Sequence, residues 1–209
     1  MVDAPSEVWN VGFLIMDGVY NTELTAPMDV FQHTVYHTDP WMRVFTVAKT
    51  TEPVTTFEGL HIIPDYGYLD SVPPIDVLVV PSAEGHMSTD LADGEMIRWV
   101  LKTGKSARYI MSLCDGAFVL ASTTLLNGLA STTFPADIKQ YKAMFPHLEV
   151  YQDAIFVHDG QAITGAGGAR SFEPALYLCE LLYGKKVADG IAKGLVIDWD
   201  VNSFPRVIK

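Results

Sequence analysis

Cysteine is scarce in this chain, which has only Cys114 and Cys179 among its 209 residues. Two cysteines do not build the disulfide framework that stabilises small secreted domains, so the sequence indicates a reducing compartment. Basic residues are also few, because 14 Lys and Arg stand against 25 Asp and Glu, for a net charge of −11. A chain this acidic lacks the positive surface that neutralises phosphates, which argues against a nucleic-acid partner.

Long apolar runs and targeting patterns are missing as well. No apolar run approaches the roughly 18 residues of a membrane-spanning helix, and there is no polybasic segment for anionic lipids. The first ten residues, MVDAPSEVWN, contain no cationic stretch followed by an apolar one, so no secretory signal is visible. The sequence therefore predicts a soluble, cytoplasmic protein with no membrane partner.

Apolar segments that alternate with helical patterns fill the rest of the chain. A hydrophobic content of 49% and a charged content of 19% are typical of one globular core, and we expect a single domain over 1–209. Strands separated by helices predict an α/β sandwich with a mostly parallel central sheet. The predicted strands are 8–16, 43–48, 76–80, 109–113, 129–132, 149–151, 154–157 and 162–164, with a hairpin at 54–63; the predicted helices are 25–37, 89–103, 115–125 and 171–183, and the residues from 199 onwards form an extended tail.

The clearest site signal is the segment 109–121, YIMSLCDGAFVLA. A predicted strand runs into Cys114 and a helix begins at once, with Gly116 two positions on, which is typical of a nucleophile elbow. The start of a helix favours a thiolate and would lower the pKa of Cys114 from its usual value of about 8.5. The alternative is a buried cysteine that packs as a small apolar side chain, and we favour that interpretation for Cys179.

Two loops that follow other predicted strands reach the same edge of the sheet, where α/β folds bind their ligands. Glu23, between the first strand and the first helix, is a candidate acid or base, and its alternative is a solvated residue before a helix. Small residues after strand 76–80 would let backbone N–H groups face a developing negative charge, the alternative being an ordinary turn. The candidates of this second loop are Ser82, Ala83, Gly85 and His86, the last as a histidine beside the thiol.

Signals for phosphate, dinucleotide and metal binding are weak. The segment 165–169, GAGGA, lacks the ending of a P-loop and the spacing of a dinucleotide fingerprint, so it predicts a tight turn. The six histidines and two cysteines show no metal-ligand spacing. We therefore expect no metal and no organic cofactor.

Three motifs in the expected order resemble the ThiJ/PfpI superfamily, which has a class I glutamine amidotransferase-like fold. They are SLCDGAFVLA at the elbow, ELTAPMDVF after the first strand, and TTF at 132–134. The similarity spans about residues 8–200, and the most similar branch is that of the isocyanide (isonitrile) hydratases and the related ligand domains of AraC-type regulators. The resemblance implies a flavodoxin-like three-layer sandwich, a homodimer, a reactive cysteine at Cys114 and an acidic partner at Glu23.

The chain departs from the hydratase pattern at four places. Glu23 stands where the hydratases have an aspartate, and Asp115 follows the cysteine where the branch has a small or hydroxyl-bearing residue. Residues 82–83 are Ser-Ala in place of the Gly-Gly of the oxyanion loop, and 134–135 are Phe-Pro where many relatives have His-Trp. Asp115 is expected to line the site, where its charge opposes formation of a thiolate unless it points away or caps the helix.

The resemblance implies a lyase-type enzyme that acts on a small molecule. Cys114 would attack the electrophilic carbon of an isocyanide, Glu23 would move the proton, and water would release an N-substituted formamide. One alternative is glyoxalase- or deglycase-like chemistry on reactive carbonyls, against which the missing histidine at 134–135 counts. Another is a redox sensor or ligand-binding protein without enzymatic activity, because an accessible thiolate oxidises readily to sulfinate. The absence of a basic helix-turn-helix pattern argues against a transcription regulator.

Overall fold

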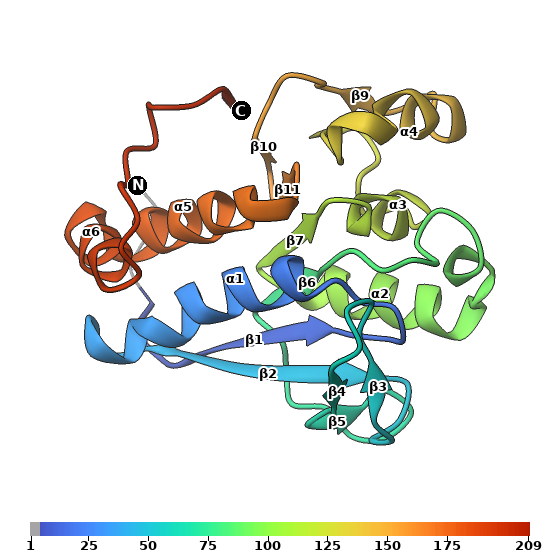
Figure 1. The fold of residues 1–209 in the computed structure, drawn as a ribbon, viewed down its shortest axis with the longest axis horizontal. Coiled ribbons are helices and arrows are strands. Elements are labelled where there is room, and N and C mark those ends of the chain that lie inside the picture. The colour runs from blue at the N-terminus through green and yellow to red at the C-terminus, as the bar shows by residue number, and fades with distance from the viewer. Residues whose placement is uncertain (1–4) are drawn as a thin grey trace.

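An eight-stranded sheet forms the centre of the computed structural model, which describes residues 5–209 (Figure 1). Four further short strands form two separate pairs, β3 with β4 and β8 with β9. In chain order the strands are β1 (Trp9–Leu14), β2 (Met42–Ala48), β3 (Val54–Thr55), β4 (His61–Ile62), β5 (Tyr66–Gly67), β6 (Val77–Val80), β7 (Tyr109–Leu113), β8 (Ala130–Ser131), β9 (Glu149–Val150), β10 (Phe156–Asp159), β11 (Ala162–Gly165) and β12 (Arg206–Ile208). The sheet has the order β12-β10-β11-β7-β6-β1-β2-β5, and its pairings are parallel except for β10 with β11. The predicted α/β fold with a mostly parallel sheet is confirmed.

Alternation along the strands sends side chains to two separate cores, one on each face of the sheet. In β1, Trp9, Val11 and Phe13 join one core and Leu14 joins the other. The same alternation divides β7, where Tyr109, Met111 and Leu113 join the first core and Ile110 joins the second. Both faces are therefore covered, which is why these strands read as continuous apolar runs.

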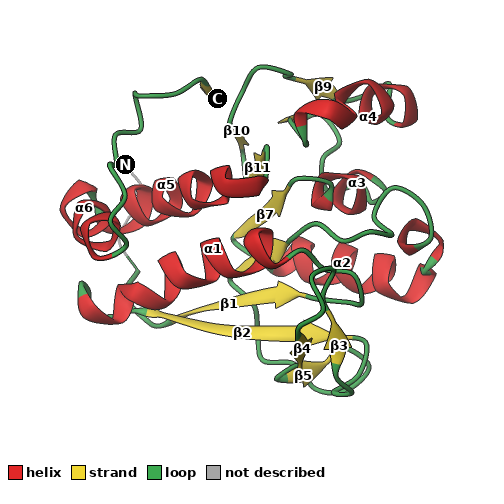
Figure 2. Cartoon of the chain, viewed as in Figure 1, coloured by secondary structure: helices red, strands yellow, loops and turns green. Residues whose placement is uncertain are grey.

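Helices cover the two faces and complete three layers, as the red ribbons of Figure 2 show. The α-helices are α1 (Asn21–Gln32), α2 (Gly94–Ser106), α3 (Gly116–Ala121), α4 (Ile138–Met144), α5 (Phe172–Tyr183) and α6 (Lys185–Gly194), and the short 3-10 turns are η1 (His33–Tyr36), η2 (Asp90–Ala92), η3 (Pro135–Asp137) and η4 (Gly168–Ser171). Apolar residues of α1, α5 and α6 pack in the first core, and those of α2, α3 and α4 pack in the second. The flavodoxin-like sandwich is confirmed.

The sequence placed some element boundaries wrongly. The first helix begins at Asn21 rather than near Thr25, because the chain turns directly from Tyr20 into α1 without a side-chain cap. The second main helix begins at Gly94 rather than 89, because the Asp93 carboxylate accepts hydrogen bonds from the N–H groups of Glu95 and Met96 and caps it there. The helix predicted over 115–125 ends at Ala121.

Other elements were missed altogether. The sequence did not predict α4, α6 or β5, which are short or polar on one side. The tail beyond residue 199 contains turns at 201–204, and its Arg206–Ile208 segment adds β12 to the edge of the sheet beside β10. The hairpin predicted over 54–63 is present as the antiparallel pair of β3 and β4.

The parallel strands direct their carboxyl ends to one side of the molecule. In Figure 1 the arrowheads of β1 and β2 point to the side where α1 begins. The loops after β1, β6, β7 and β11 meet at this edge and carry the residues described below. Within residues 5–209, no helix combines the length and the apolar character needed to cross a membrane.

Candidate active site

Cys114 lies at a strained corner between β7 and α3. Its backbone has a φ of 54°, in the left-handed region that L-residues rarely occupy. The corner is this tight because α3 begins against the end of β6, where a Cβ at position 116 would overlap the carbonyl oxygen of Val80. Gly116 is therefore needed for close packing, and the strand–turn–helix geometry is that of a nucleophile elbow.

Glu23, in the first turn of α1, is linked to the elbow by a loop for which the sequence predicts only a tight turn. This loop, 165–169, contains two residues of positive φ, Gly167 and Gly168. The carbonyl oxygen of Gly165 accepts the N–H of Cys114 at 2.9 Å, and a Cβ on Gly167 would lie 2.8 Å from Cα of Cys114. The N–H of Gly168 donates to Oε1 of Glu23, also at 2.9 Å. The loop therefore contacts both the cysteine and the glutamate, although they are 91 positions apart in the chain.

The sequence contained a usable signal for this loop. The segment follows a predicted strand, 162–164, and precedes a predicted helix, so it reaches the same edge of the sheet as the elbow. Its glycines fit no phosphate-binding pattern, but they let the backbone of this loop approach another loop closely.

Asp115 brings a second carboxylate to the cysteine. It is 8% exposed, and its Oδ1 lies 3.3 Å from the hydroxyl of Thr133, which also donates to the carbonyl oxygen of Cys114 at 3.0 Å. Burial, and then the charge of the half-buried Asp137, raise the pKa of Asp115 to about 6. The structure thus places Asp115 beside the thiol rather than pointing away, and it does not cap α3 with its side chain.

The thiol of Cys114 does not have the lowered pKa expected at the start of a helix. Burial raises the pKa of the Cys114 thiol, and the negative charges of Asp115 and Glu23 raise it further. The nearby hydroxyl of Ser82 acts in the opposite direction but does not compensate. The helix dipole is weak here because α3 has only six residues, so desolvation and neighbouring charge decide the direction.

Access distinguishes the two cysteines. Cys114 is buried but retains 7% exposure, and Glu23 retains the same fraction. Cys179 is 0% exposed and packs within α5 among apolar residues of the first core. Both thiols are free.

In the loop after β6, His86 does not face the thiol, and the N–H of Ala83 does not point towards an oxyanion. His86 is fully buried, and its Nδ1 accepts the N–H of Ala83 at 3.2 Å while its Nε2 faces the sulfur of Met16 at 3.1 Å. The ring nitrogens are therefore engaged away from the thiol, and the Ala83 N–H donates to His86. Burial lowers the pKa of His86 to about 3, so the ring is neutral at physiological pH.

Two other candidates of this loop have different surroundings. The Ser82 hydroxyl is buried next to Cys114 and forms no hydrogen bond of ordinary geometry with the residues that the structure describes. Gly85 is half-buried, and a side chain there would overlap the carboxylate of Asp90. Gly85 therefore serves the packing of the loop against η2.

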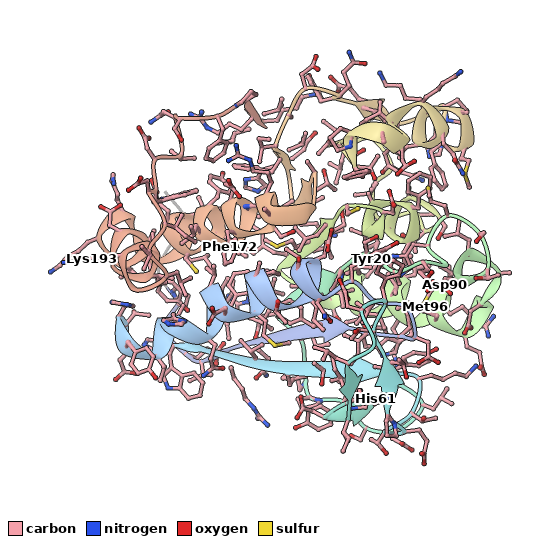
Figure 3. All side chains as sticks on the ribbon, viewed as in Figure 1. Tyr20, His61, Asp90, Met96, Phe172 and Lys193 are labelled. Carbon is pink, nitrogen blue, oxygen red and sulfur yellow. The ribbon has the colours of Figure 1, made fainter. Side chains whose placement is uncertain are left out.

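An aromatic pair that sequence patterns do not indicate lies beside the carboxylates of Glu23 and Asp115. Tyr20, labelled in Figure 3, directly precedes α1, and its ring lies 4.6 Å from the ring of Phe57. Burial raises the pKa of the Tyr20 phenol, and the neighbouring acidic groups of Glu84, Cys114, Asp115 and Glu23 add to the effect. Phe57 is 54% exposed, so the pair presents an apolar surface beside the charged groups.

Metal ligands do not gather in the part of the chain that the structure describes. Among residues 5–209, no group of three or more His, Cys, Asp or Glu side chains could hold a metal ion. The chemical groups at the edge of the sheet are one thiol, two buried carboxylates and the surrounding hydroxyls.

Sequence and structure comparisons assign this arrangement to a family. The sequence profile of the DJ-1/PfpI family matches residues 10–181. The chain belongs to the DJ-1/PfpI family. Isonitrile hydratase of Pseudomonas putida is 32% identical over 180 residues, which cover 85% of this chain and 74% of that protein. Glutathione-independent glyoxalase DJR-1.2 of Caenorhabditis elegans is 27% identical over 158 residues, covering 75% of this chain and 82% of that protein.

The fold of this DJ-1/PfpI chain is also similar to solved structures. The crystal structure of a ThiJ/PfpI family protein from Pseudomonas syringae superposes with a TM-score of 0.81 at 25% identity, covering 92% of this chain and 76% of the other. The family predicted from the motifs at the elbow, after the first strand and at 132–134 is thus confirmed.

Proposed function

We propose that this DJ-1/PfpI chain is a cysteine-dependent hydratase that converts an isocyanide and water to an N-substituted formamide. The observation that carries the proposal is the position of the Cys114 thiol at the elbow, beside the buried carboxylates of Glu23 and Asp115. The similarity to isonitrile hydratase supports the choice of substrate.

The raised thiol pKa fits a nucleophile that loses its proton only as it attacks. A carboxylate beside the sulfur can take this proton while the sulfur–carbon bond forms, so no resting thiolate is needed. In this mechanism Glu23 receives the thiol proton through its free oxygen, because its other oxygen, Oε1, accepts the N–H of Gly168. The same raised pKa disfavours a redox sensor, since oxidation of a cysteine follows its thiolate character.

The charge of the site favours a neutral substrate. Glu23, Asp115 and Asp137 are acidic, and a substrate that carries a carboxylate would be repelled by them. An isocyanide is neutral, and its N-substituent would contact the aromatic pair of Tyr20 and Phe57.

The decisive experiment follows formamide production from an alkyl isocyanide by NMR or chromatography. We expect Cys114→Ala to abolish turnover and Cys179→Ala to retain it, because Cys179 is enclosed in the apolar core. Equal activity in Cys114→Ala and the wild type would refute the proposal.

A parallel assay with methylglyoxal tests the second candidate function, which the similarity to the glyoxalase supports. Turnover of methylglyoxal alone, again lost in Cys114→Ala, would replace the hydratase proposal with carbonyl chemistry. We also propose a homodimer, which sedimentation equilibrium would measure directly; a single monomeric species at micromolar concentration would contradict it.

A further inference from the structure

Asp115 is placed to act on the reaction and not only on the charge of the thiol. Asp115 directly follows Cys114 at the elbow, its side chain is 8% exposed, and the adjacent thiol favours the ionised form of the acid. The hydroxyl of Thr133 contacts Oδ1 and the carbonyl oxygen of Cys114, and so holds the carboxylate and the elbow together. The second oxygen of Asp115 makes no such contact with Thr133 and can interact with a bound molecule.

Hydration of an isocyanide requires proton transfers in two different half-reactions. One proton must pass from sulfur to the isocyanide carbon as the covalent adduct forms, and another must leave water as the adduct is hydrolysed. We propose that Asp115 is a second catalytic acid–base group, which activates the water that hydrolyses the adduct, while Glu23 serves formation of the adduct and the final return of a proton to sulfur. This inference rests on the proposed hydratase function.

The two half-reactions balance with these assignments. In the first, the sulfur–carbon bond forms, Glu23 takes the thiol proton, and Glu23 delivers it to the lone pair of the isocyanide carbon, which leaves a thioimidate on Cys114. In the second, water adds its oxygen to the thioimidate carbon and its proton to Asp115, which passes that proton to the nitrogen. The carbon–sulfur bond then breaks, the hydroxyl proton returns to sulfur through Glu23, and the N-substituted formamide leaves. No oxidant, metal or further reactant takes part.

The surroundings of Asp115 suit a group that both takes and returns a proton near neutrality. A general base works best when its pKa lies close to the working pH, and the pKa of Asp115 is raised to about 6. Besides burial, the charges of Asp137 from η3 and Glu23 from α1 raise the pKa of Asp115, and the Thr133 hydroxyl and the adjacent thiol act against the increase. Burial is the largest cause.

The test compares Asp115→Asn with Glu23→Gln and the wild type. We expect Asp115→Asn to reduce kcat about 100-fold or more and to accumulate Cys114 carrying the added mass of one isocyanide, detected by intact-protein mass spectrometry. Glu23→Gln is expected to lose activity without accumulating this adduct. A burst of isocyanide consumption equal to one per chain should precede the slow turnover of Asp115→Asn.

Alkylation by iodoacetamide separates chemistry from simple electrostatics. Because the charge of Asp115 raises the thiol pKa, Asp115→Asn should be alkylated several-fold faster than the wild type at pH 7.5 while it hydrates isocyanide more slowly. If hydration and alkylation both become faster, Asp115 only suppresses the thiolate and the inference is wrong. If hydration slows without any adduct, Asp115 has a structural role and the inference is equally wrong.

A second variant keeps the test independent of the folding of Asp115→Asn. Among neighbouring charges, that of Asp137 raises the pKa of Asp115 most, and Asp137→Asn removes it. In a plot of kcat against pH, the decrease in kcat at acidic pH should therefore move to lower pH. A decrease that stays in place would overturn the assignment. A wild-type protein that forms no formamide refutes the hydratase function and this inference together, whereas an active wild type with a fully active Asp115→Asn refutes only the inference.

Discussion

Replacement of Gly167 by alanine tests the close contact between the 165–169 loop and the elbow. Position 167 has a φ of 83° and a ψ of −164°, a region occupied almost only by glycine, which costs an L-residue about 1–3 kcal/mol. The new Cβ would overlap the Cβ of Cys114 and lie 2.8 and 2.9 Å from its Cα and N. Relief of such an overlap costs about 1–3 kcal/mol, because the elbow backbone is itself held between β7 and α3.

Some of this cost is offset in the unfolded chain, where alanine has less freedom than glycine, by about 0.4–1 kcal/mol. We therefore expect Gly167→Ala to lower the free energy of unfolding by about 2–4 kcal/mol. For a chain of this size that corresponds to a decrease in Tm of roughly 4–16 °C. Urea denaturation followed by circular dichroism, together with a thermal scan, measures both quantities.

The neighbouring glycine provides a matched control. Gly168 also has a positive φ, of 58°, but a Cβ there would meet nothing within 4 Å. Gly168→Ala should therefore carry only the backbone cost, a loss of about 1 kcal/mol or less. If the two variants lose the same stability, the contact between Gly167 and Cys114 does not constrain the loop and the reasoning about the site is wrong.

Two further predictions concern other parts of the fold. Burial lowers the pKa of His86 to about 3, so the neutral ring stabilises the fold at neutral pH, and this contribution is lost as the pH falls from about 6.5 towards 3. His86→Asn should therefore flatten this part of the curve of unfolding free energy against pH, measured by urea titration. An unchanged slope would contradict the assignment. The indole Nε1 of Trp199 donates a hydrogen bond to Oε2 of Glu180 at 2.6 Å. Trp199→Phe should therefore lower the free energy of unfolding by about 1 kcal/mol and speed the exchange of the backbone amide hydrogens of β12. Amide protection equal to that of the wild type would show that other contacts hold the tail.

The sequence determined the architecture and the position of the elbow. The strand at 109–113 was placed correctly because its apolar run ends where a glycine and a helical pattern begin, and such patterns depend on neighbours in the chain. The order of strands and helices was enough to predict a sheet covered on both faces. The pairing of Glu23 with Cys114 was predicted from the resemblance to a family, because the periodicity of the sequence does not indicate it.

Only the tertiary structure decided what surrounds the sulfur. The N–H of Gly168 meets Glu23 across 145 positions of sequence, and Thr133 meets Asp115 across 18. No local pattern encodes these distances, because they depend on how the carboxyl ends of several strands are arranged side by side in the sheet. Sequence reasoning predicted a lowered pKa for Cys114 from its helix, and the structure shows a raised one, because the burial and charge that determine the pKa come from loops that only the fold brings together.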